Sequence, residues 1–138
     1  MMASSATVLS PMLLTGIQSI DLEHGELLGL LDKLVHDKPY STPNSEYFSE
    51  ITSKIGAIIH RHFENEEKIF TASPMPEDDK AAHIRAHDEI LDQYAQLHLE
   101  QMSGKQLDRT HTIRMIQKWV LEHLTTHDLK IKAYVTKQ

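Results

Sequence analysis

The sequence predicts an all-α protein, an antiparallel up-down four-helix bundle. In four long segments, apolar residues recur at the three- and four-residue steps of one helical face, and short polar loops separate these segments. No segment shows the strict alternation of apolar and polar residues that is typical of a strand. The length of 138 residues suits a single domain, and we expect an N-terminal extension over 1–15 followed by the bundle over 16–138.

Loop and capping residues give the expected bounds of the four helices. Asp21 is the expected N-cap of the first helix, and Asn44 or Ser45 is that of the second. Two prolines in the stretch 71–76 separate the second helix from the third. The first helix is expected over about 20–37, and the second from its cap to about residue 70. The third is expected from Glu77 to about Ser103, and the fourth over about 106–127.

The composition excludes several classes of function. Asp and Glu number 20 against 14 Lys and Arg, and the resulting charge of −6 disfavours binding to nucleic acid. The chain has no cysteine, so disulfides, iron–sulfur clusters and thiol catalysis are excluded, and any metal must be held by nitrogen and oxygen atoms. Neither a signal peptide nor a run of about 18 apolar residues is present, which predicts a cytoplasmic protein with no membrane partner.

Six polar residues stand on the apolar faces, where the helical pattern predicts core. An unpaired buried polar group costs roughly 1–3 kcal/mol, so these residues must satisfy one another or share metals. An HxxxE pair and an HxxxH pair each place two donors one turn apart, from which both can reach one ion. A solvated face would explain any single pair, but inward motifs on different helices favour metal binding. The six residues are His24, His62, Glu66, His83, His87 and His123.

The second donor of the fourth helix is ambiguous from spacing. His123 and His127 are four residues apart, and this ordinary helical spacing favours His127. Asp128 follows His123 by five residues, about 140° round an ideal helix. It can reach the same centre only where the helix widens or ends.

In chain order, these histidines and carboxylates resemble the signature of the hemerythrin family, H…HxxxE…HxxxH…HxxxxD, over about residues 17–128. The resemblance implies a di-iron site in the core of the bundle, with two Fe2+/Fe3+ ions, an oxo or hydroxo bridge and dioxygen as a reversible ligand. Five imidazoles and two carboxylates agree with iron, because magnesium and calcium prefer oxygen ligands and a closed zinc site needs only four donors. The ligands that the resemblance implies are His83, His87 and His123 for one iron, His24 and His62 for the other, and Glu66 and Asp128 as bridges.

Four apolar side chains near these positions are core residues that also form a candidate oxygen pocket: Phe63, Phe70, Trp119 and Val120. The family signature usually has a leucine where this chain has Val120. The remaining histidines are expected to be exposed or to lie beside the site without binding metal; they are His36, His60, His98, His111 and His127.

The expected function is reversible oxygen binding, as a carrier, store or sensor, rather than catalysis. Small anions and nitric oxide are further candidate ligands of such a centre. A di-iron redox enzyme, which would act as an oxidase, a peroxidase or a nitric-oxide-handling protein, is the alternative. Ferritin-like oxidases draw on more glutamate ligands than this chain offers, which favours oxygen binding. A metal-free structural bundle is a third possibility.

Overall fold

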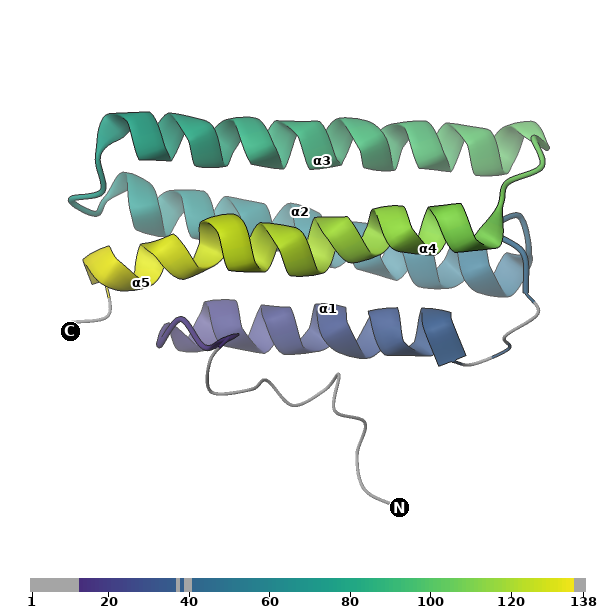
Figure 1. Cartoon of the computed structure of the whole chain (residues 1–138), viewed down its shortest axis with the longest axis horizontal. Coiled ribbons are helices and arrows are strands. Elements are labelled where there is room, and N and C mark those ends of the chain that lie inside the picture. Colours follow the sequence, from purple (N-terminus) through teal and green to yellow (C-terminus); the bar gives the residue numbers. More distant parts are fainter. Residues whose placement is uncertain (1–12, 37, 39–40, 136–138) are drawn as a thin grey trace, which may run out of the picture.

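The computed structural model describes residues 13–36, 38 and 41–135, and within these ranges the chain is helical with no strand. Four helices lie side by side, and each runs antiparallel to the one before it (Figure 1). The expected extension over 1–15 falls almost wholly outside the described residues. The helices are α1 (Gln18–His36), α2 (Glu46–Thr71), α3 (Glu77–Ser103) and a fourth made of α4 (Arg109–Gln117), η3 (Lys118–Glu122), η4 (Leu124–Asp128) and α5 (Leu129–Val135).

The helix ends follow local side-chain chemistry. The Ser45 hydroxyl accepts the backbone N–H of Phe48 at 3.2 Å and caps α2, as expected for one of its two candidate caps. Gly104 ends α3 with a left-handed φ of 83°, a conformation that glycine adopts without a Cβ clash. Asp108, at the N-cap of α4, accepts the N–H of His111 at 2.7 Å.

Asp21 does not cap the first helix, contrary to expectation. Helix α1 begins three residues earlier, at Gln18. The Asp21 carboxylate instead accepts the backbone N–H groups of Thr15 and Gly16, at 2.9 and 3.2 Å. Asp21 therefore holds the segment before the helix against the first turn of α1, because its carboxylate accepts N–H groups from two residues that precede the helix.

The fourth helix extends beyond its expected end near residue 127. It continues to Val135, and between Lys118 and Asp128 most of its backbone forms π-helical turns, which are wider than α-helical ones. Ile131, beyond these turns, is completely buried. The expected end near residue 127 rests on the α-helical period, and the widened turns shift the apolar face away from that period. This shift explains why we expected the helix to end too early.

Two apolar clusters fill the core. The larger lies among all four helices, and the smaller consists of Ile20, Phe70, Met75 and Ile131. Along α1, His24 lies between Ile20 of the smaller cluster and Leu27 of the larger. Along α2, Glu66 lies between Phe63 and Phe70 in the same way. The buried histidines and the two carboxylates Glu66 and Asp128 therefore form a layer between two apolar layers.

Gly56 of α2 lies against the ring of Tyr94 of α3. A Cβ built on this glycine would overlap the ring of Tyr94. We expect Gly56→Ala to lower the free energy of unfolding by about 1–3 kcal/mol, the usual cost of overpacking, even though alanine favours a helix over glycine by about 1 kcal/mol. Urea unfolding followed by circular dichroism measures the change.

The control is the same substitution in a Tyr94→Ala background, where the ring is gone. There Gly56→Ala should be neutral or stabilising. A loss of stability of equal size in both backgrounds would show that the contact with Tyr94 is not the cause.

Candidate metal centre

All seven residues expected to bind metal are buried in one cluster between the two apolar layers. None of them is more than 5% exposed. Each of the four helices contributes at least one of these residues, so the cluster lies where the helices meet. They are His24 from α1, His62 and Glu66 from α2, His83 and His87 from α3, and His123 and Asp128 from the fourth helix.

The two oxygens of Asp128 face different sets of imidazoles. Oδ2 lies 2.7 Å from Nε2 of His24 and 3.3 Å from Nε2 of His62. Oδ1 lies 3.0 Å from Nε2 of both His83 and His123. One carboxylate thus stands between two groups of nitrogen donors.

The two oxygens of Glu66 also face different imidazoles. Oε1 lies 3.1 Å from Nε2 of His87 and 3.5 Å from Nε2 of His83. Oε2 lies 3.5 Å from Nε2 of His62. The side chains therefore form two groups of possible metal donors that share Glu66 and Asp128: one adds His83, His87 and His123, and the other adds His24 and His62.

The widened helix explains how Asp128 enters the cluster. Asp128 ends the π-helical turn η4, and this turn brings the fifth residue after His123 to the side of His123. His127, which ordinary helical spacing favoured, is half-buried and belongs to neither donor group, although its ring centroid lies 5.2 Å from that of His123.

Burial and neighbouring charges set the protonation of the cluster. Burial raises the pKa of Asp128, but His123 and hydrogen bonds from His24 and His62 outweigh burial, and the net pKa lies well below its usual value. For Glu66, burial and the charge of Asp128 act together and raise its pKa well above the usual value. Burial, His123 and His83 lower the pKa of His87 to about 2, so this imidazole is neutral at pH 7.

The inner nitrogen of His62 shows why the cluster needs a cation or a proton. Its outer Nδ1–H donates to Glu23 Oε1 at 2.8 Å, because an ionised carboxylate can only accept. Nε2 of the neutral ring then turns a lone pair toward Asp128 Oδ2. Two lone pairs repel each other, and in the metal-free protein His62 takes up a proton more readily: burial lowers its pKa, but hydrogen bonds with Asp128 and Glu23 outweigh burial and raise it.

Unpartnered donor atoms in the cluster fit a metal. Among the described side chains, Glu66 Oε2 and His123 Nε2 are buried without a hydrogen-bond partner. His123 Nε2 is close to Asp128 Oδ1 but not in a direction that makes a hydrogen bond. Buried polar atoms are nearly always satisfied, and both of these atoms belong to the metal-donor groups. A bound cation would satisfy both of them.

Residues 15–135 match the family model of the hemerythrin HHE cation-binding domain. The chain belongs to the hemerythrin family. The match covers all seven cluster residues and confirms the resemblance drawn from the signature. Comparisons with curated proteins and with solved structures gave no significant match. Within the described part of this hemerythrin domain, no helix has the length and apolar character needed to cross a membrane.

Aromatic rings cover part of the hemerythrin cluster. The ring of Phe63 stacks on His87 with a centroid distance of 3.7 Å, and that of Phe70 stacks on His83 at 4.6 Å. Trp119 is buried and donates its indole N–H to Gln93 at 2.6 Å, and Val120 is buried in the same apolar cluster as Phe63. The four residues expected to form an oxygen pocket therefore all lie in the apolar layers beside the cluster.

The other histidines lie outside both donor groups. Four of them are exposed, and His60 donates its Nδ1–H to the carbonyl of Gly56 at 2.8 Å, as a surface residue of α2. Burial, together with His123 and His83, lowers the pKa of the half-buried His127 to about 4. The exposed four are His36, His60, His98 and His111.

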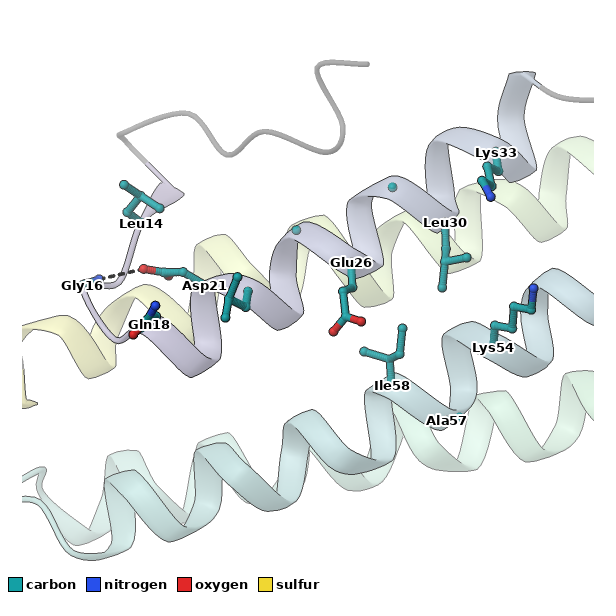
Figure 2. A pocket seen from close by; sticks show the side chains of 13 residues that line it. Leu14, Gly16, Gln18, Asp21, Glu26, Leu30, Lys33, Lys54, Ala57 and Ile58 are labelled. Carbon is teal, nitrogen blue, oxygen red and sulfur yellow. Dashed lines mark hydrogen bonds between the residues drawn. The ribbon is translucent and has the colours of Figure 1, made fainter. Parts of the chain in front are cut away.

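One hollow on the described surface is lined by no residue of the metal-donor groups. It is a groove of about 1140 Å³ along the outside of α1 and α2. Leu30 and Ile58 face each other across it, and Lys33 and Lys54 stand at one end (Figure 2). A second hollow runs between α3 and the fourth helix, and its lining includes Trp119, His123 and His127. Only the second hollow reaches a residue of the metal-donor groups.

Glu66→Gln is expected to stabilise the metal-free domain by an amount that grows with pH. Below about pH 4.5, the usual pKa of the carboxyl, Glu66 is protonated in both the folded and the unfolded chain. Above this pH the unfolded chain ionises first, because folding raises the pKa, and ionisation then favours unfolding. Glutamine cannot ionise, so the free energy of unfolding of the variant should exceed that of the wild type increasingly as pH rises.

Urea unfolding of chelator-treated protein at several pH values measures this difference. Glu64→Gln is the matched control, because Glu64 lies on the same helix but is exposed. A difference between Glu66→Gln and wild type that stays constant with pH would contradict the assignment of a raised pKa to Glu66.

Proposed function

We propose that this hemerythrin domain binds two iron ions and takes up dioxygen reversibly. The observation that carries the proposal is the orientation of the Glu66 and Asp128 carboxylates. Each carboxylate turns one oxygen toward each group of imidazoles. A carboxylate placed in this way can bridge two cations. Seven protein donors are too many for a single ion, and nitrogen with carboxylate oxygen suits iron.

The two positions would differ in their number of protein ligands. His83, His87 and His123 would hold one ion, and His24 and His62 the other, with both carboxylates shared. The first position then has five protein donors and the second has four, so the second leaves more room for a small ligand. A pair of ferrous ions supplies the two electrons that reversible uptake of dioxygen requires.

The surrounding side chains would keep water and protons out. Phe63 and Phe70 lie flat on imidazoles of the cluster, and Trp119 and Val120 are buried beside it. Apolar walls around a metal limit solvent access and so slow the loss of a bound small molecule. Bridging by only two carboxylates, with five neutral imidazoles, favours oxygen binding over the oxidase chemistry of glutamate-rich centres.

Visible absorption tests the function directly. Protein loaded with ferrous iron without oxygen is exposed to air and then returned to an oxygen-free atmosphere. We expect a charge-transfer band that appears in air and disappears when oxygen is removed, over repeated cycles. Irreversible bleaching accompanied by turnover of an added reductant would instead indicate a di-iron redox enzyme, and the absence of any iron-dependent band would contradict both functions.

Asp128→Ala tests the bridging role. Because Asp128 is within reach of both donor groups, its loss should lower the iron content from two ions to about one per chain and abolish the reversible band. The iron content of purified, reconstituted protein measures the effect. His127→Ala is the matched control: it removes a half-buried histidine next to Asp128 that lies in neither group, and it should retain both ions. Two ions in Asp128→Ala, or one in His127→Ala, would contradict the assignment.

A further inference from the structure

Two of the buried imidazoles donate a hydrogen bond from their outer N–H group to a carboxylate. Nδ1–H of His62 donates to Glu23 Oε1, and Nδ1–H of His87 donates to Glu67 Oε2, both at 2.8 Å. One of these histidines belongs to each metal-donor group. When Nδ1 carries the proton, Nε2 presents its lone pair to the centre, which is the form of the ring that binds metal.

The two outer carboxylates are held differently. The Glu23 side chain is only 12% exposed, against 37% for Glu67. Glu23 also accepts hydrogen bonds from Arg61 Nε at 3.4 Å and from Asn65 Nδ2 at 3.3 Å. Both of these donors lie on α2, the helix that carries His62, so they fix the carboxylate of α1 against the helix whose imidazole it orients.

The group that contains His62 depends more on such support. It has four donors where the other group has five, and His62 and His24 are its imidazoles. Nδ1 of His24 is buried and has no hydrogen-bond partner among the described residues. Of the two imidazoles in this group, His62 is therefore the one whose ring is anchored from outside.

We propose that Glu23 is a positioning residue for the metal position formed by His24 and His62, and that Arg61 and Asn65 hold it in place. The inference rests on the proposed di-iron centre. Without Glu23, the His62 ring can rotate and exchange its proton between Nδ1 and Nε2. Loss of such an outer partner typically weakens metal binding by about 10–100-fold, and here the loss should fall on one of the two ions.

The test compares three variants of the full chain. Glu23→Ala removes the acceptor, and Glu23→Gln keeps an oxygen that can accept Nδ1–H. The matched control is Glu26→Ala, because Glu26 also binds Arg61, at 3.1 Å, but is 53% exposed. Figure 2 shows its carboxylate among the residues that line the groove along α1 and α2, none of which belongs to the metal-donor groups.

Anaerobic titration with ferrous iron against a chromogenic chelator measures the affinity of each ion. In Glu23→Ala one ion should bind about 10–100-fold more weakly while the other is unchanged; Glu23→Gln should lie between Glu23→Ala and wild type, and Glu26→Ala should equal wild type. Imidazole 15N NMR of the zinc-loaded proteins gives a second readout: Nδ1–H of His62 should exchange slowly with water in wild type and in Glu23→Gln, and faster in Glu23→Ala.

The outcomes separate the two proposals. If wild type binds fewer than two ions, the di-iron centre itself is wrong. If wild type binds two and Glu23→Ala binds both with unchanged affinity, only the role of Glu23 is overturned. Equal weakening of both ions in Glu23→Ala and Glu23→Gln, with unchanged NMR signals of His62, would also overturn it, because Glu23 would then act through the fold rather than through His62.

Discussion

The buried carboxylate of Asp128 is the group on which the arrangement of the four helices depends. It lies within 3.3 Å of an imidazole from every helix: His24 on α1, His62 on α2, His83 on α3 and His123 on its own helix. An unpaired charge inside a protein costs several kcal/mol, so the fold is stable only when these partners are present together. One anionic side chain therefore specifies which faces of all four helices must meet.

The apolar layers alone do not give this specificity. Burial of leucine and isoleucine is favourable in proportion to area and has no direction, so apolar faces alone specify a unique register of the helices less strictly. Hydrogen bonds and ion pairs in a polar layer have fixed lengths and directions. The polar layer thus sets the register of the bundle, and the apolar layers on both sides supply most of the stability and keep solvent from the carboxylates. The stacking of Phe63 on His87 and of Phe70 on His83 couples the two kinds of layer directly.

Much of this could be predicted from the sequence, because helical periodicity is a local property. The HxxxE and HxxxH pairs lie on regular α-helix, so their spacing alone predicted inward donors one turn apart, and the helix ends at Ser45 and Gly104 follow from residue type. Asp128 could be placed only through the family signature, because its position requires a backbone that no single residue indicates. The sequence did not predict a role for Glu23, because this role depends on contacts with Arg61 and His62, which are 38 and 39 residues away along the chain. The adjacency of Glu23 to His24 is a signal, but adjacent helical residues normally face different sides.

The π-helical turns of the fourth helix have a consequence for how the chain length can vary. A π-helical turn holds one residue more than an α-helical turn, so η4 is equivalent to an α-helix that has gained one residue between His123 and Asp128. Beyond it, Ile131 still faces the core with Ile20 and Phe70. The extra residue is absorbed within one turn and does not rotate the last turns of the helix. A change in the type of this one turn can thus accommodate a residue gained or lost between these two donors, with the apolar layer beyond the turn left in place.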